Sequence, residues 1–254
     1  MRFQNISIEK RDRISILTIN RPPANSINLA TMEEINSALN DLEQDRQVRV
    51  LILTGAGEKG FSAGFDVSDA ANADRIGPMG QEVWTRIDLF PKPVIAAING
   101  YAFGGGCELA MACTFRLMME GARIGLTELN LGIIPGWGGT QRMPRLVGRA
   151  KALDLILFSK RMTAPEALQI GLVDRVFPQA EFMKEVMAFA DILAKRPPIA
   201  VSAVLKAVHA GLDRGLAEGT KVELEGSRAV TKSKDAREGF TAFFEKREPN
   251  FTGE

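Results

Sequence analysis

The sequence predicts an α/β fold in which strands alternate with helices over roughly residues 1–150, followed by a mostly helical region. Short runs of β-branched and other apolar residues, at 48–54 and 93–98, have the length of buried strands. Glycine-rich segments separate these runs from helical patterns. After about Gly148 the pattern of the chain is mostly that of helices.

The first elements follow from local patterns. Residues 3–10 and 13–19 suit two strands joined by a polar turn. Thr31 is predicted to cap a helix, with Glu34 completing a capping box three residues later. The helix keeps apolar residues at helical spacing. The strand at 48–54 comes next.

The remaining elements extend the alternation. We expect a helix near 81–89, a strand at 93–98, a helix from Gly104 to about Cys113 and a strand at 115–119. Repeated strand–strand–helix units would fit a coiled, solenoid-like core, although no clear sequence repeat is present. Further helices are expected near 149–158, 163–170, 181–195, 198–212 and 214–246, with a last short strand at 173–177 before Pro178.

Composition narrows the class of partner. The 254 residues are 45% apolar and 25% charged, which is ordinary for a globular protein. A net charge of +1 gives no argument for nucleic acid or an anionic membrane as the main partner. No apolar run approaches the ~18 residues of a membrane span. We therefore expect no nucleic-acid or membrane partner.

Two observations favour the cytoplasm. Residues 1–10 (MRFQNISIEK) lack the apolar core of a signal peptide. Cys107 and Cys113 lie in an apolar run and are six positions apart, which is not one face of a helix. Buried free thiols are the expected state of both, and this fits a reducing compartment.

Two glutamates carry most of the functional information. Glu108 lies in residues 99–109 (NGYAFGGGCEL), where a glycine-rich turn leads into a helix. Glu128 lies in the mostly apolar residues 125–132 (GLTELNLG). A carboxylate in apolar surroundings costs free energy unless it is paired or its pKa rises. Two such groups with backbone donors nearby indicate acid/base chemistry beside a bound carbonyl.

Two glycine-rich segments could supply those donors. Gly104, Gly105 and Gly106 open a helix, whose first N–H groups are free to bind an oxyanion or a phosphate. The alternative is close packing of the helix on a strand. Residues 60–66 (GFSAGFD) also follow a buried strand, and taken alone they fit a surface turn better than a donor loop.

Several other chemistries are disfavoured. Residues 55–60 match G-x-G-x-x-G, but Glu58 and Lys59 suit a solvated turn rather than the helix start that a dinucleotide site requires. The single histidine, His209, suits a helix surface. One histidine and two scattered cysteines make a zinc site improbable, and no G-x-S-x-G motif is present. We expect no metal.

Trp137 stands in the glycine-rich residues 132–142 (GIIPGWGGTQR), just before a helical pattern. It could form the wall of an apolar substrate pocket. Alternatively, it could pack over neighbouring glycines. The sequence does not choose between these interpretations.

Taken together, these segments resemble the crotonase family, also called the enoyl-CoA hydratase/isomerase superfamily. The resemblance covers nearly the whole chain, and the motifs are specific as a set. They comprise residues 21–28 (RPPANSIN), 61–66 (FSAGFD), 92–100 (KPVIAAING), the triple glycine with Glu108, 134–142 (IPGWGGTQR) and 238–247 (EGFTAFFEKR).

The resemblance implies a crotonase-type spiral of ββα turns at residues 1–195, which binds acyl-CoA. It implies a C-terminal helical region at 196–254 that forms homotrimers, which often pair into hexamers. The ligand would be an acyl-CoA thioester, with no cofactor beyond the coenzyme A of the substrate. Residues matched to substrate or CoA binding are Ala24, Ala63, Gly64, Asp66, Ser68, Gly104, Trp137, Phe243 and Lys246, the last two toward a neighbouring subunit.

The resemblance also implies the chemistry. The backbone N–H groups of Phe65 and Gly105 would hold the thioester oxygen. Hydratases of the family keep both glutamates, and here Glu108 would be the base that activates water and Glu128 the acid that protonates the α-carbon. The expected activity is therefore that of an enoyl-CoA hydratase. Isomerisation, or hydration of a branched or cyclic acyl group, is an alternative, and a non-catalytic acyl-CoA binder is another.

Four positions depart from the hydratase pattern. Phe65 and Trp137 stand where alanine is common, which puts the acyl group in doubt. Ser68 replaces a frequent lysine near the CoA phosphates and weakens that contact. Thr114 replaces an aspartate that commonly follows Cys113.

Overall fold

Two mostly parallel sheets form the centre of the protein. The computed structural model describes residues 3–57 and 59–254. The larger sheet has the strand order β1 (Ile6–Arg11), β2 (Ile14–Ile19), β3 (Val50–Gly55), β5 (Val94–Ile98), β7 (Phe115–Met119) and β10 (Arg175–Phe177). The smaller sheet has the order β4 (Gly60–Ser62), β6 (Tyr101–Phe103), β8 (Arg123–Gly125) and β9 (Met162–Thr163). The pairs β1–β2 and β8–β9 are antiparallel.

The chain alternates between the two sheets in successive turns. Each of β3, β5 and β7 in the larger sheet is followed by β4, β6 or β8 in the smaller sheet, and β4 and β6 are each followed by a helix. Within each sheet these strands pair in parallel, for example Ile52 with Ile95 and Ala102 with Ile124. The arrangement confirms the expected spiral of ββα turns, although the sequence carries no visible repeat.

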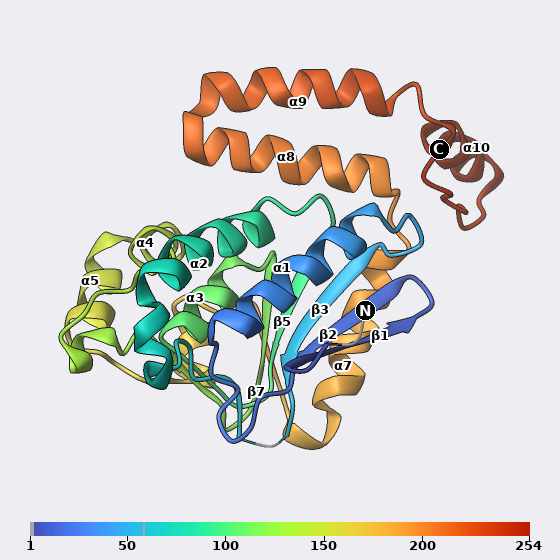
Figure 1. The fold of residues 1–254 in the computed structure, drawn as a ribbon. Coiled ribbons are helices and arrows are strands. Elements are labelled where there is room, and N and C mark those ends of the chain that lie inside the picture. Colours follow the sequence, from blue (N-terminus) through green and yellow to red (C-terminus); the bar gives the residue numbers. More distant parts are fainter. Residues whose placement is uncertain (1–2, 58) are drawn as a thin grey trace.

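Helices surround the sheets (Figure 1). The α-helices are α1 (Leu29–Gln44), α2 (Ala73–Asp88), α3 (Gly105–Ala112), α4 (Gly139–Val147), α5 (Arg149–Leu157), α6 (Ala164–Gln169), α7 (Phe182–Ala194), α8 (Pro198–Arg214), α9 (Leu216–Val230) and α10 (Lys234–Glu245). Short 3₁₀ helices are η1 (Val67–Asn72), η2 (Glu128–Leu131) and η3 (Gln179–Glu181).

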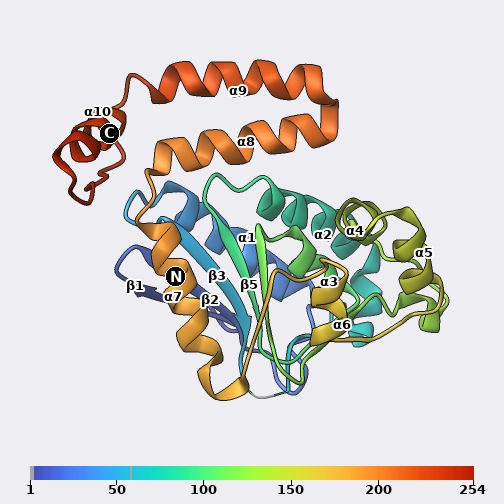
Figure 2. The same cartoon turned by 180° about the vertical axis from the view of Figure 1, so that it is seen from behind.

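The larger sheet is buried on both faces, which explains its nearly continuous apolar strands. Figure 2 shows α7 lying across one face. There, Val50 and Ile52 pack with Phe182 and Val186 of α7. The alternate residues of β3 face the opposite way, into the core formed with α1, α2 and α3. The period of two along each strand thus divides the core into two layers.

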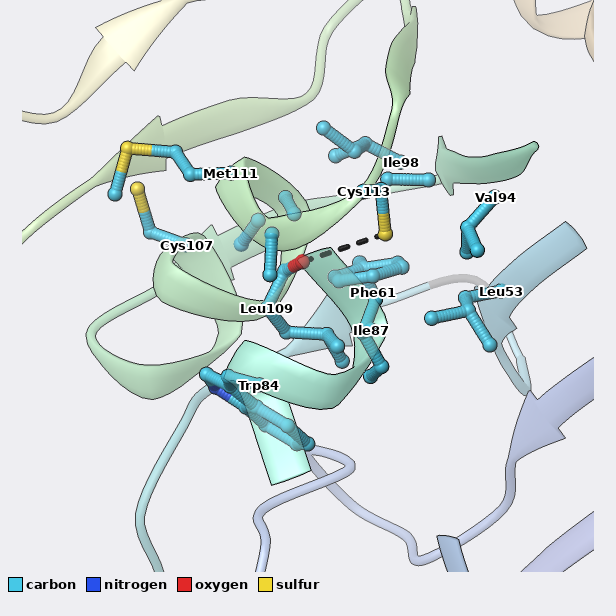
Figure 3. Close-up of a cluster of buried hydrophobic side chains, with 14 of the residues drawn as sticks. Leu53, Phe61, Trp84, Ile87, Val94, Ile98, Cys107, Leu109, Met111 and Cys113 are labelled. Atoms are coloured by element: carbon cyan, nitrogen blue, oxygen red, sulfur yellow. Dashed lines mark hydrogen bonds between the residues drawn. The ribbon is translucent and has the colours of Figure 1, made fainter. Parts of the chain in front are cut away.

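The core beside α3 is densely apolar (Figure 3). Phe61 and Trp84 have no exposed surface, and Leu109 of α3 packs in the same cluster. Cys107 and Cys113 are buried and free, as predicted. The Cys113 thiol donates to the Leu109 carbonyl at 3.3 Å, a contact drawn in Figure 3. This cluster fixes α3, which carries Glu108.

The C-terminal helices stand apart from the sheets. Figures 1 and 2 show α8 and α9 as an antiparallel pair above the core, with α10 at one end of the pair. Their apolar side chains are largely exposed in the single chain: Val204, Val208, Leu212, Leu216, Leu224, Phe240, Phe243 and Phe244. Within the described chain, every helix falls short of the length or apolar character that a membrane span requires.

Three local predictions were wrong. The cap of α1 is Asn28 rather than Thr31, because the Asn28 side chain accepts from the Thr31 N–H at 2.9 Å. Glu34 accepts instead from the backbone of Gln4 and Asn5. The expected helix at 214–246 is two helices, since a turn follows α9 and Ser233 caps α10. Residues 60–62 form a buried strand and not a surface turn.

We expect Asn28→Ala to lower the free energy of unfolding by about 1 kcal/mol, because the first turn of α1 loses its side-chain acceptor. Urea unfolding at one fixed protein concentration measures the change. Asn28→Ser keeps an acceptor and serves as the control. Equal stability of the alanine and serine variants would contradict the assignment of the cap.

Candidate active site

Glu108 and Glu128 line the same cavity, which has a volume of about 220 Å³. Its walls come from residues after β4, from the start of α3, from η2 and from the loop before α4. The parallel pairing of β6 with β8 places the two glutamates side by side in space, because each follows one of these strands. Residues far apart in the sequence thus share one small apolar space.

The carboxylate of Glu108 is anchored by backbone donors. Its Oε1 accepts from the N–H groups of Trp137 at 2.8 Å and Gly139 at 2.7 Å. The side chain is 2% exposed. Burial raises the pKa of Glu108, while the N–H bonds from Gly139 and Trp137 and the charge of Arg142 oppose that rise. The net shift is upward, and these groups limit it because each favours the charged form.

Glu128 has the opposite environment. It begins η2, and neither of its buried carboxyl oxygens has a hydrogen-bond partner among the described residues. Burial, and then the charge of Glu108, raises the pKa of Glu128 to about 7. A buried polar group without a protein partner calls for an external one. The two glutamates therefore differ in hydrogen bonding, and the pKa of Glu128 lies near neutrality.

Two free backbone donors lie beside the glutamates. Gly105 is the first residue of α3, so its N–H has no carbonyl partner within the helix. Ile27 forms a parallel bridge beside Phe65: its N–H donates to the Gly64 carbonyl, and its carbonyl accepts from the Asp66 N–H. Because both bonds flank Phe65, the N–H of Phe65 points away from Ile27. Gly64 has a φ of +84°, and a Cβ there would lie 2.5 Å from the Gly105 nitrogen. The close approach brings Phe65 against the start of α3.

The triple glycine and Trp137 are closely packed, and Gly104, Gly105 and Trp137 also line the cavity. A Cβ on Gly105 would lie 2.2 Å from the Trp137 ring, and one on Gly80 of α2 would lie 2.3 Å from it. The glycines are therefore needed for close packing, and the first N–H groups of α3 also remain available. Trp137 is packed over glycines and lines the cavity as well.

Arg142 fixes the loop before α4, whose N–H groups bind the Glu108 carboxyl group. Its Nε donates to Asp88 at 2.8 Å, and its Nη1 donates to the Trp137 carbonyl at 2.9 Å. Asp88 also lies 3.9 Å from Nδ1 of His209 on α8, which is a helix-surface histidine as expected. The loop is thus fixed at both its N–H and its carbonyl groups.

The other predicted residues divide into three groups. Ala63 and Gly104 line the cavity. Ala24, Gly64, Asp66 and Ser68 build the adjoining loop: the Ala24 carbonyl accepts from Ala63, and Asp66 accepts from Ser68 and pairs with Arg21 at 2.6 Å. Phe243 and Lys246 belong to the α10 region, which Figure 1 shows at the far end of the C-terminal helices from α3. Within one chain they do not meet the cavity.

One wall of the cavity was not predicted from the sequence. Ala73, Ile76 and Gly77 of α2 line the cavity, but the helix was expected to begin only near residue 81. Pro78 inside α2 hid its first half, because proline disfavours a helix interior. The spacing of Ile76, Gly80 and Val83, all buried, was the available signal.

Two structural observations bear on the metal and dinucleotide chemistries. In residues 3–57 and 59–254, no cluster of three or more His, Cys, Asp or Glu side chains is arranged to hold a metal. The Gly55–Gly60 motif joins β3 to β4, two strands, where a dinucleotide fingerprint needs a strand and a helix. Glu58 of that motif lies outside the described residues.

Comparison with known proteins gives a consistent result. A match to the family described as enoyl-CoA hydratase/isomerase spans residues 9–254. A short-chain-enoyl-CoA hydratase of Clostridium acetobutylicum is 40% identical, with 97% of each chain covered. A crotonyl-CoA hydratase of Syntrophomonas wolfei is also 40% identical, with 99% of each covered. The crystal structure of an enoyl-CoA hydratase from Bacillus anthracis superposes with a TM-score of 0.96 at 41% identity, covering 99% of this chain and 100% of that one.

The environment of Glu128 predicts a pH-dependent stability. Its folded pKa of about 7 exceeds the ordinary 4.5, so its contribution to stability is present below pH 4.5 and is lost as the pH rises through 7. The loss should be on the order of 3 kcal/mol, at ~1.4 kcal/mol for each pKa unit. Unfolding free energies between pH 4.5 and 8 should decline less steeply for Glu128→Gln than for the unmodified protein.

Glu82 is exposed on α2, so Glu82→Gln is the matched control. This variant should show the same decline of unfolding free energy with pH as the unmodified protein. If Glu128→Gln retained the full decline, the buried carboxyl would not be its source.

Proposed function

Because the chain belongs to the enoyl-CoA hydratase/isomerase family, we propose that it adds water across the 2,3-double bond of an enoyl-CoA thioester. The observation that carries this proposal is the pair of buried glutamates on one cavity, one with two backbone donors and one with none. Hydration needs a base to take a proton from water and an acid to give one to carbon. The two glutamates differ in their hydrogen bonding, which suits them to these two different roles.

The thioester carbonyl fits between the N–H groups of Phe65 and Gly105. Negative charge grows on that oxygen when water attacks the β-carbon, so the two donors stabilise the transition state more than the ground state. The indole Nε1 of Trp84 donates to the Gly105 carbonyl at 3.1 Å, so the peptide that follows the donor N–H is anchored. One such donor is worth about 3 kcal/mol in related sites.

The two glutamates then divide the proton transfers. Ionised Glu108 takes a proton from the water as its oxygen bonds to the β-carbon. Glu128, which holds a proton near neutral pH, gives it to the α-carbon. The α-carbon gains a proton and the β-carbon a hydroxyl, so the reaction is redox-neutral and reversible. The substrate supplies the coenzyme A, and no further cofactor takes part.

The relatives indicate the substrate class. Those from Clostridium acetobutylicum and Syntrophomonas wolfei are named for short-chain enoyl-CoA and crotonyl-CoA. We propose crotonyl-CoA as the test substrate for this chain. A cytoplasmic location remains a prediction, supported by the two buried free thiols.

Glu108→Gln and Glu128→Gln should each lower the rate of crotonyl-CoA hydration by ~10²–10⁴, because each removes one proton transfer. Mass spectrometry of the product should show the gain of one water with the unmodified protein. Glu82→Gln should hydrate normally. An isomerised product of unchanged mass would favour the isomerase alternative, and tight binding without turnover would favour a binder. Near-normal rates in either active-site variant would exclude the two-glutamate mechanism.

We further propose that residues 196–254 assemble the chain into a trimer or a pair of trimers. The support is the exposed apolar surface of α8–α10, where hollows of about 560 and 690 Å³ are lined mainly by apolar side chains. Such extended apolar surface is typical of subunit interfaces. In this assembly Phe243 and Lys246, which lie far from the cavity of their own chain, would contact the CoA of a neighbour.

Light scattering should give a mass that is a multiple of three chains of 27.7 kDa. Leu212→Glu, at an exposed apolar position of α8, should lower that mass because a charge at a buried interface is costly. Leu157→Glu, at an equally apolar exposed position of α5, should leave it unchanged. A monomer at all concentrations would overturn the proposed assembly.

A further inference from the structure

The ring of Trp137 is held rigidly between α2 and α3. It is 5% exposed and lies over Gly80 and Gly105, with no room for a Cβ at either glycine. It meets Trp84 edge to face, with centroids 5.6 Å apart, and Phe65 in the same manner at 6.3 Å. Edge-to-face pairs of this kind add to the stability of apolar packing.

The backbone of Trp137 is equally fixed. Its N–H donates to Glu108, and its carbonyl accepts from Arg142. A swing of the indole ring that moved this backbone would also disturb the N–H donors that bind the Glu108 carboxyl group. The ring is therefore a fixed wall and not a movable gate.

The exposed fractions of the lining residues show that Trp137 lies at the inner end of the cavity. The lining residues Val67, Leu131 and Ile134 are 61%, 64% and 72% exposed, so they surround the mouth. Ile76 and Trp137 are almost fully buried and form the inner end. Trp84 stands behind Trp137 and does not line the cavity.

We propose that Trp137 closes the inner end of the acyl pocket and restricts the enzyme to short acyl chains. The inference rests on the proposed hydratase function and deepens it. A cavity of about 220 Å³ is smaller than the roughly 300–1,000 Å³ of most small-molecule sites. The reacting carbons must lie beside Glu108 and Glu128, so further methylenes would have to occupy the volume of the indole ring.

Removing the ring should open apolar space. Trp137→Ala would join the cavity to the volume bounded by Gly80 and Trp84. Each methylene that gains an apolar site in a pocket changes specificity by ~10-fold or more. The N–H of residue 137 is retained in any substitution except proline, so the donor to Glu108 remains.

The test compares kcat/KM for crotonyl-CoA, 2-hexenoyl-CoA and 2-decenoyl-CoA. The unmodified protein should prefer crotonyl-CoA. The ratio of decenoyl to crotonyl kcat/KM should rise about tenfold or more in Trp137→Ala, and by less in Trp137→Leu, which fills part of the space. Trp84→Phe is the matched control, since it alters a neighbouring ring that does not line the cavity, and its ratio should stay near that of the unmodified protein.

Removing a buried tryptophan ring costs about 3–5 kcal/mol, so thermal melting must accompany the kinetics. If the alanine variant fails to fold, the leucine variant and the chain-length profile of the unmodified protein decide the question. An unchanged ratio in a folded variant, or equal use of crotonyl-CoA and decenoyl-CoA by the unmodified protein, would overturn the inference. Failure of the unmodified protein to hydrate any of the three substrates would instead refute the proposed function.

Discussion

A single buried carboxylate organises the site. Glu108 lies on a helix packed inside an apolar core, where an unpartnered charge costs several kcal/mol. The N–H groups of Trp137 and Gly139 satisfy it, and they come from a loop that Arg142 and Asp88 tie to α2. The loop before α4, the start of α3 and the end of α2 are therefore positioned together by the need to solvate one charge with protein dipoles.

The second glutamate gains its chemistry from the absence of such partners. Glu128 shares the cavity with Glu108 but has no donor within the described chain, and the neighbouring charge raises its pKa further. Burial raises the pKa of both side chains, but two backbone N–H donors oppose the rise at Glu108. The apolar lining supplied by Trp137, Ile76 and Phe65 lowers the local dielectric constant and so strengthens the electrostatic interactions of both carboxyl groups.

Much of the fold could be predicted because its strongest elements have strong local patterns. The buried strand near residues 93–98 is a continuous apolar run, and the strand at 115–119 is apolar except for Arg116. The predicted bounds match β5 and β7 closely. The smaller sheet was missed because β4, β6 and β8 have three residues each, too few for a period to emerge. Asn28 was overlooked as a cap because Thr31 and Glu34 matched the capping-box pattern, while the Glu34 side chain bonds to the N-terminal strand region instead.

The candidate site also has features that could be predicted from local sequence and features that could not. The two glutamates stood out as carboxylates in apolar segments, a property of the local sequence. Their meeting in one cavity depends on strand pairing between segments, which no local pattern encodes. The fixed position of Trp137 depends on glycines in α2 and α3, and Pro78 obscured the half of α2 that completes the wall.

The pairing of β6 with β8 has a consequence for how this chain can tolerate change in length. Phe103 lies opposite Gly125 in parallel register, and the Gly104 N–H bonds to the Gly125 carbonyl at 3.0 Å. Slipping β8 by one residue would shift Glu128 by ~3.3 Å and turn the side chains of β8 to the other face. Insertions in the exposed turn at Gly121 leave this alignment intact, whereas a single residue added between Gly125 and Glu128 would displace Glu128 from Glu108 without altering either side chain.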